Sequence, residues 1–212
     1  MILKEISVRT LPKNEFQKRF NSETWCIREM YWRKLGKFTT EKIEKVVMIL
    51  GENRPYKKYG SVLSIYKSFN FETYFNSNEL DRKKIVLELI HNEMTILFQK
   101  DNVNKNKLIE AYNYCLGKNL DNKWLFKEKH YQSPKDKYYG SIECEWNLNN
   151  FKATGIISDL EKNEIYRAEL LEVEPYEGDF IYWSRCGWDG DTFYLESKDK
   201  KKWNVIIPEV IQ

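Results

Sequence analysis

The feature that most constrains the fold is a pair of helix-like segments placed between two sets of strand-like segments. Apolar residues from Val86 to Leu97 recur at helical spacing and form one stripe, which predicts an amphipathic helix over about 78–100. A second helix is predicted over about 105–116. Because strands are expected on both sides of this pair, the chain should form an α+β protein.

The two helices carry recognisable start and stop residues. Asn78 is the predicted N-cap of the first helix, because its amide can accept a hydrogen bond from the first helical turn. Asn104 is the predicted cap of the second helix, and Gly117 is its predicted left-handed terminator. These residues set the helix boundaries more sharply than propensity alone.

The N-terminal part contains three predicted strands, at 2–9, 42–50 and 63–75, of which the last has large apolar residues at odd positions. The segment 13–36 fits a helix or a strand equally well. From Lys123 onward, short strand-like segments follow one another at the spacing of an antiparallel meander. They are 124–130, 138–146, 151–158, 164–173, 179–186, 192–197 and 203–207.

The predicted fold is therefore α+β, with largely antiparallel sheets and two consecutive helices between an N-terminal and a C-terminal set of strands. We expect a single domain over 1–212, because no repeat or long linker divides the chain. The segment 118–122 is a soft internal boundary between a basic part and an acidic, strand-rich part.

The formal net charge of +3 conceals a gradient along the chain. Residues 1–60 contain 14 Lys and Arg against 7 Asp and Glu, and residues 61–140 contain 13 against 10. Residues 141–212 contain 8 against 15, together with 11 of the 32 aromatic residues. An acidic and aromatic surface suits docking to a basic protein.

Targeting signals and cysteine usage indicate a cytoplasmic protein. The first charged side chain is that of Lys4, and no apolar segment follows it, so we expect no signal peptide. The longest aliphatic run, 46–50, is too short to span a membrane. No CxxC pair occurs, and the four cysteines are expected to be reduced and at least half-buried.

No familiar catalytic or metal-binding motif is present. Glu88 and His91 have the spacing of a di-iron ligand pair, but such a site needs a second pair and two more glutamates. The other histidine, His130, lies on a predicted strand. The segment 187–191 is better explained as a hairpin turn than as a calcium loop. We therefore expect no catalytic residues, no cofactor and no metal.

Two charged regions permit both a structural and a functional interpretation. The basic N-terminal part mixes cations with Phe20, Trp25, Trp32 and Tyr56, a combination that can bind phosphates and stack bases, or can simply be a solvated face. The acidic C-terminal part can be the polar outer face of a sheet, can pair with the chain's own basic part, or can attract a cationic partner.

Residues 69–117 contain three segments that resemble a known group of proteins, namely FNFETYF at 69–75, LDRKKIVLELIH at 80–91 and LIEAY at 108–112. A strand that leads into an Arg-Lys-Lys helix, with a short second helix behind it, resembles bacterial toxin-immunity proteins of the polymorphic or contact-dependent type. The resemblance covers about a quarter of the chain. It implies stoichiometric inhibition of a cognate toxin, without catalysis.

Such an interface needs rigid aromatic anchors with acidic neighbours when the toxin domain is basic. The candidate partner-binding residues are Glu177, Asp179, Tyr182, Trp183, Trp188, Asp189 and Asp191. Two alternatives stay open. One is a nucleic-acid-associated accessory or phage-defence protein that uses the basic part, and the other is an enzyme whose site gathers His91 or His130 with carboxylates.

Overall fold

The computed structural model describes residues 1–11, 15–100 and 102–206. The chain divides into two compact units, Met1–Asn122 and Lys123–Gln212, and the division directly follows the segment 118–122. Helices and mostly antiparallel strands are both present, which confirms the α+β class. Among the described residues, no helix has the length and apolarity needed to cross a membrane.

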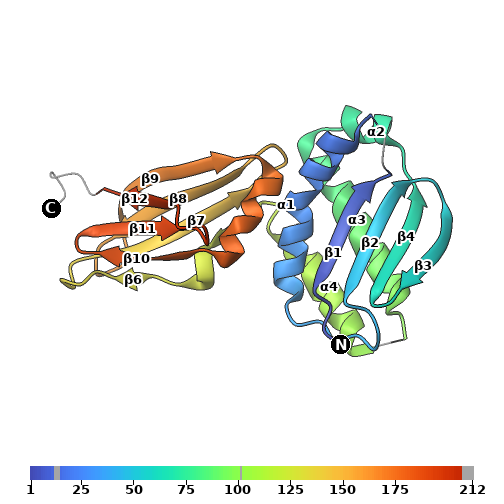
Figure 1. Cartoon of the computed structure of the whole chain (residues 1–212), viewed down its shortest axis with the longest axis horizontal. Helices are drawn as coiled ribbons and strands as arrows, with labels where there is room; N and C mark the ends of the chain where they lie inside the picture. The colour runs from blue at the N-terminus through green and yellow to red at the C-terminus, as the bar shows by residue number, and fades with distance from the viewer. Residues whose placement is uncertain (12–14, 101, 207–212) are drawn as a thin grey trace. The chain divides into compact units, whose positions relative to one another are not determined.

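The described residues of the first unit form one four-stranded sheet and four helices (Figure 1). The strand order is β1-β2-β4-β3, with β1, β2 and β4 parallel and β3 antiparallel at the edge. The elements are β1 (Glu5–Thr10), α1 (Gln17–Leu35), β2 (Lys45–Gly51), β3 (Arg54–Tyr59), β4 (Val62–Ser68), α2 (Phe71–Asn76), α3 (Glu79–Leu97) and α4 (Asn102–Gly117).

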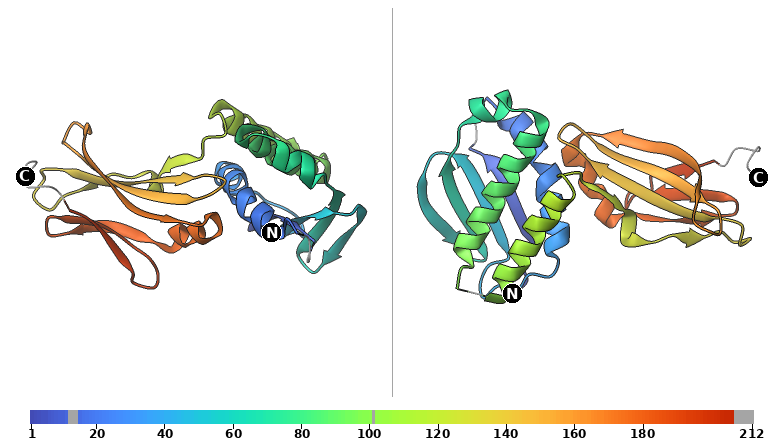
Figure 2. Two further views of the ribbon diagram at one scale, coloured as in Figure 1. Left: turned by 90° about the horizontal axis from the view of Figure 1, so that it is seen from above. Right: turned by 180° about the vertical axis from the view of Figure 1, so that it is seen from behind.

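The two faces of this sheet differ in what covers them. Figures 1 and 2 show α3 and α4 on one face and α1 along β1, while no described helix lies over the opposite face. Strand alternation directs one set of apolar side chains towards the helices, and all of these are buried. They are Ile6, Val8, Val46, Met48, Leu50, Leu63 and Ile65.

Helix α1 also closes the free edge of β1. The Thr24 hydroxyl donates to the carbonyl oxygen of Val8, and the side-chain oxygen of Asn21 accepts from the amide of Thr10 at 2.9 Å. These bonds satisfy backbone groups that an edge strand would otherwise offer to another chain. The ambiguous segment 13–36 is thus helical from Gln17, and residues 12–14 lie outside the described part.

A buried charge network joins α1 to α2 and α3. The carboxylate of Glu23, 2% exposed, accepts from Arg82 at 2.7 and 2.8 Å, from Arg19 at 2.8 Å and from the Tyr74 hydroxyl at 3.0 Å. A buried carboxylate is tolerated only with such complete pairing. Arg82 belongs to the Arg-Lys-Lys segment, so the part of the chain that carries the family resemblance is used here for internal packing.

The predicted strand over 63–75 is wrong in its second half. Strand β4 ends at Ser68, and α2 begins after Asn70, whose side chain accepts from the amide of Thr73 at 2.9 Å. The alternating phenylalanines do not line a strand face. Phe69 and Phe71 instead pack around Phe20, with ring centroids 5.2 and 5.3 Å from it.

Both predicted helices are present, but the two boundary residues predicted for the second helix, Asn104 and Gly117, are wrong. Asn78 caps α3 as predicted and accepts from the amide of Asp81 at 2.9 Å. Helix α4 begins earlier than predicted, at Asn102, so Asn104 lies inside it and donates to the carbonyl oxygen of Thr39. The left-handed residues after α4 are Asn119 and Leu120, with φ of 52° and 57°, and not Gly117.

Residues 123–206, the described part of the second unit, form two sheets. One has the order β5-β7-β8-β9 with β6 paired to β7, and the other has the order β10-β11-β12. The elements are β5 (Lys123–Leu125), η1 (Phe126–Glu128), β6 (Tyr131–Gln132), β7 (Tyr139–Trp146), β8 (Phe151–Ser158), β9 (Glu164–Val173), the 3-10 helix η2 (Pro175–Trp183), β10 (Arg185–Asp189), β11 (Thr192–Glu196) and β12 (Lys202–Val205).

The two sheets pack face to face around an aromatic core. Trp146, Phe151 and Phe193 are all fully buried, and Trp146 and Phe151 meet edge to face at 5.0 Å. Gly155 faces Val205 of the smaller sheet so closely that a Cβ atom would have no room. Small residues on β8 therefore set how closely the sheets approach.

Three strand predictions in this unit need correction. The segment 124–130 is a strand only as far as Leu125, and its continuation is interrupted by Lys127 at φ 55°. The segment 179–186 is mostly η2, because Pro175 at the first helical position preorganises a helical start. The last strand is Lys202–Val205, and Ile207 lies outside the described residues. The hairpin turn predicted within 187–191 is confirmed between β10 and β11, and a second hairpin turn, at 147–150, joins β7 to β8.

Candidate functional site

The exposed surface of η2 combines aromatic rings with carboxylates. A 3-10 helix has three residues per turn, so side chains three apart lie on one face. Pro175, Gly178 and Ile181 form the buried face. The two other faces consist of Tyr176, Asp179 and Tyr182, and of Glu177, Phe180 and Trp183. We call these two faces the η2 surface.

Large rings on the η2 surface are unusually accessible. Trp183 is 61% exposed, Tyr176 46% and Tyr182 41%, and the rings of Tyr182 and Trp183 meet edge to face at 6.5 Å. Exposed aromatic groups beside polar ones mark interaction sites on soluble proteins. Tyr176 is absent from the sequence-based candidates, although its three-residue spacing from Asp179 could have identified it.

The backbone of η2 is held firmly in place. The indole nitrogen of Trp146 donates to the carbonyl oxygen of Pro175 at 3.0 Å. Gly178 lies directly against Phe151, where an added Cβ atom would come within 2.6 Å of the ring. At the other end, the hydroxyl of Ser184 donates to the carbonyl oxygen of Phe180 at 3.0 Å. The exposed rings therefore project from a rigid support.

The structure does not bring all the predicted site residues together. Trp188 is half-buried, packs on Phe193 at 5.1 Å and donates to the carbonyl oxygen of Tyr131, so its indole is part of the core. Asp189 and Asp191 lie at the β10–β11 turn, at the opposite end of β10 from Trp183. Four residue steps at about 3.3 Å per residue place the ends of β10 about 13 Å apart.

These two aspartates are also neutralised within the chain. Asp189 forms an ion pair with Lys202 at 2.7 Å, and Asp191 forms one with Lys135 at 2.7 Å. The Lys202 ammonium lowers the pKa of the Asp189 carboxyl. By contrast, Glu174, the residue before η2, and Glu177 on η2 form no ion pair with any described residue. The acidic character of the candidate site is therefore concentrated on η2.

Much of the remaining acidic charge belongs to ion pairs on the outer face of the larger sheet. Arg167 bridges Glu143 and Glu164 at 2.9 and 2.8 Å, and Lys152 bridges Glu169 and Glu172 at 3.6 and 3.0 Å. Strand alternation alone places these residues outward. For this group, the interpretation as a polar outer face is the one the geometry favours.

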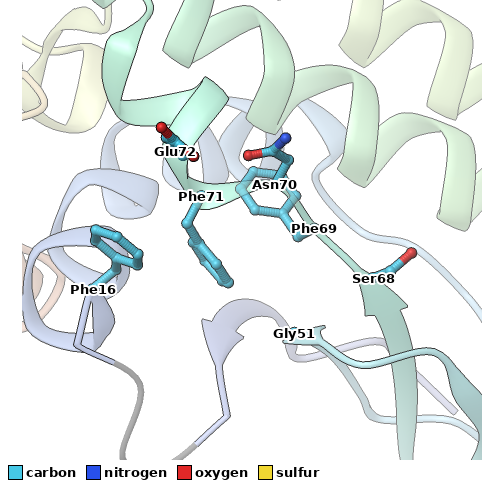
Figure 3. A pocket seen from close by; sticks show the side chains of 7 residues that line it. All are labelled: Phe16, Gly51, Ser68, Phe69, Asn70, Phe71 and Glu72. Atoms are coloured by element: carbon cyan, nitrogen blue, oxygen red, sulfur yellow. The ribbon is translucent and has the colours of Figure 1, made fainter.

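A separate hollow of about 520 Å³ lies at the carboxyl ends of β2 and β4 (Figure 3). Gly51 and Ser68 end the two strands, and Phe16 and Phe71 stack beside them at 5.7 Å. Glu72 is the one carboxylate among the lining residues, and no histidine, lysine or cysteine accompanies it. These residues do not assemble the paired groups that acid–base or nucleophilic catalysis requires.

Both histidines pack against aromatic rings. His91 stacks on Tyr112 at 4.3 Å, and its Nδ1 lies 3.4 Å from the Tyr31 hydroxyl. Burial lowers the pKa of His91. His130 meets Tyr139 edge to face at 6.4 Å. In the described ranges, no three His, Cys, Asp or Glu side chains group closely enough to hold a metal ion.

Cys26, Cys115 and Cys144 are buried and Cys186 is half-buried, which confirms the predicted burial of the cysteines. Burial raises the pKa of Cys26 and of Cys115 to about 12, so neither thiol is a ready nucleophile. Comparisons of the chain with protein-family models, with curated proteins and with solved structures found no match.

Proposed function

We propose that this chain is a non-catalytic binding protein that neutralises a cognate bacterial toxin by stoichiometric binding, as an immunity protein does. The partner is a basic protein domain, and the η2 surface is the contact site. The observation that carries the proposal is the coincidence of Trp183, Tyr176 and Glu177, all exposed, on one rigid 3-10 helix.

Rigid aromatic anchors favour tight binding because little conformational entropy is lost when they are covered. Tryptophan and tyrosine dominate the energetics of protein interfaces and act most strongly when their backbone is already ordered. Here the Pro175 carbonyl is held by Trp146, and Gly178 is wedged on Phe151. An inhibitor that must act one-to-one benefits from this preorganisation.

The charge of η2 indicates the chemistry of the partner. Glu174, Glu177 and Asp179 lie within six residues, and no basic residue lies within the segment 174–184. Such a surface attracts a cationic partner and repels an acidic one, which raises the association rate and improves selectivity. Domains that act on nucleic acids are commonly cationic, and a toxin of that class fits this surface.

The test is co-expression with the product of the neighbouring gene. We expect that product alone to arrest growth and this chain to restore it, with a one-to-one complex on size exclusion. Trp183→Ala should weaken the complex by about 2 kcal/mol or more, or roughly 30-fold in Kd, as expected for a hot-spot residue. Glu177→Lys should slow association and weaken binding further.

Matched controls lie elsewhere in the same unit. Leu160 is 56% exposed and Asp191 is paired with Lys135, so Leu160→Ala and Asp191→Asn remove comparable groups away from η2. Both should leave affinity unchanged. If the neighbouring product were harmless, or if the η2 variants rescued growth and bound as well as the controls, the proposal would be wrong.

A further inference from the structure

The sheet face of the first unit that bears no described helix displays three rows of side chains. Paired residues in a ladder share a face, so the register assigns each row. From β1 to β3, the rows are Glu5, Lys45, Val62 and Tyr59; then Ser7, Val47, Ser64 and Lys57; then Arg9, Ile49, Tyr66 and Arg54. We call this surface the open sheet face.

Cations outnumber anions on the open sheet face. Lys45 pairs with Glu5 at 2.7 Å, the one acidic residue in the three rows. Arg9 and Lys57 are exposed, and among the described residues neither has an acidic partner within ion-pair distance. Arg54 pairs with Glu52 in the loop before β3. Unbalanced positive charge therefore remains on the two outer strands, β1 and β3.

Aromatic rings accompany these cations. Tyr59 is 69% exposed at the end of β3, in the same row as Lys45. Tyr66 is half-buried in the neighbouring strand, and the guanidinium of Arg54 lies over its ring at 5.8 Å. Val47 and Ile49 on the same face are only 2% and 7% exposed, so the face is not an apolar patch that needs a hydrophobic cover.

A sheet face that combines an exposed ring with unpaired cations is suited to single-stranded nucleic acid. Bases stack on aromatic rings, and phosphates are neutralised by Arg and Lys, largely without dependence on sequence. An acidic protein segment would satisfy the cations but would leave the Tyr59 ring without a planar partner. Duplex nucleic acid keeps its bases stacked internally and cannot offer them to the ring.

We propose that the open sheet face binds single-stranded nucleic acid, with Arg9 and Lys57 on the phosphates and Tyr59 stacked on a base. This site carries the opposite charge to the η2 surface and serves a different partner, so it does not rest on the proposed immunity function. The unpaired cations and the exposed Tyr59 ring, on a sheet face that bears no described helix (Figure 2), indicate the same occupant.

The test uses the full chain and fluorescently labelled U20 and dT20, with binding followed by anisotropy at 50 and 200 mM salt. We expect binding of either strand, the tighter of the two identifying the sugar preferred. Arg9→Glu combined with Lys57→Glu should weaken binding at least tenfold at 50 mM salt. The slope of log K against log salt should become shallower by about 1.4, at about 0.7 per phosphate contact.

The control double variant is Lys105→Glu with Lys118→Glu, which makes the same charge change at exposed residues on and just after α4. It should retain most of the affinity. Tyr59→Ala should weaken binding about fivefold or more, whereas Tyr59→Phe keeps the ring and should bind like the original chain. Circular dichroism of each variant checks that the fold is intact.

Four results would overturn the proposal. One is the absence of binding to both strands at 50 mM salt. The second is an equal loss in the control double variant, which would mean diffuse attraction to a basic unit. The third is an equal loss in Tyr59→Phe and Tyr59→Ala. The fourth is a labelled 20-base-pair duplex that binds as tightly as the single strands with the same dependence on Arg9 and Lys57.

Discussion

Gly178→Ala tests whether the η2 surface depends on the close contact between η2 and the sheet. A Cβ atom at this position would lie 2.6, 2.8 and 2.9 Å from three atoms of Phe151. The ring has no free space to move into, because Phe151 is fully buried and packs on Trp146 at 5.0 Å and on Phe180 at 5.9 Å. The backbone of η2 must therefore shift outward.

The size of the effect follows from two opposing contributions. Overpacking of a filled core costs about 1–3 kcal/mol. Replacing glycine restricts the unfolded chain and returns about 0.4–1 kcal/mol. The free energy of unfolding should therefore fall by about 1–2 kcal/mol. Affinity for the partner should fall as well, because the shift displaces Tyr182 and Trp183 from their preorganised positions.

Gly187→Ala is the matched control in the same unit. Its Cβ atom would meet the Tyr194 side chain at ordinary distances of 3.5 Å or more, so stability should be unchanged or slightly higher. Urea unfolding followed by tryptophan emission measures both variants. The reasoning is refuted if Gly178→Ala unfolds at the same urea concentration as the original chain, or if the control loses as much.

Three further predictions follow from the buried groups. Arg82→Met should reduce the free energy of unfolding by about 3–5 kcal/mol, because it leaves the buried Glu23 carboxylate without its closest partner. Lys84→Met, which removes the exposed ion pair with Glu88, is the control and should change the free energy of unfolding by less than about 1 kcal/mol in the same urea assay. Because burial lowers the pKa of His91, the unfolded chain binds more protons at this residue than the folded chain does, so its contribution to stability is complete above the ordinary histidine pKa of about 6.5 and declines as the pH falls through the folded value. His91→Gln should flatten the decline in the free energy of unfolding between pH 7.5 and 5, and an unchanged slope would exclude His91 as its source. Cys186 should react with a thiol reagent in the folded chain much faster than the three buried cysteines, which should react only on unfolding, and equal rates for all four would contradict the burial pattern.

The features that the sequence predicted correctly depend on interactions between residues that are close together in the chain. Asn78 caps α3 because an amide side chain and a following acidic turn need only neighbours in sequence. The turn at 190–191 and the outward charges of β7 to β9 also follow from short-range geometry. Such features depend on a few adjacent residues, and no distant contact in the structure competes with them.

The wrong strand predictions concern residues whose packing partners are distant in the sequence. Phe69 and Phe71 alternate like strand residues, yet they surround Phe20, which comes from a helix about 50 positions earlier. In η2, strand-favouring residues from Phe180 to Trp183 concealed a period of three in which Pro175, Gly178 and Ile181 are buried. Neither pattern is distinguishable from a strand until the partner surface is known.

Candidate acids failed for the same reason, since their availability depends on distant cations. Asp191 is paired with Lys135, 56 residues earlier, although no basic residue occurs in the sequence from Cys186 to Ser197. Glu177 also lies in a segment without basic residues, 168–184, but it forms no ion pair with any described residue. The two acids are therefore separated by the structure, because the sequence around both of them is equally free of cations.

Lys135→Met tests whether the partner is held by the η2 surface itself or by the overall negative charge of the second unit. It releases Asp191 and makes the chain more acidic by one unit, at a cost in stability below about 1 kcal/mol for an exposed pair. If the η2 surface is the contact site, the rate at which the partner dissociates should stay unchanged, while Glu177→Lys should raise it. Surface plasmon resonance with the immobilised partner measures both rates. A slower dissociation in Lys135→Met, comparable in size to the effect of Glu177→Lys, would mean that the overall field of the unit holds the partner, and the assignment to η2 would fail.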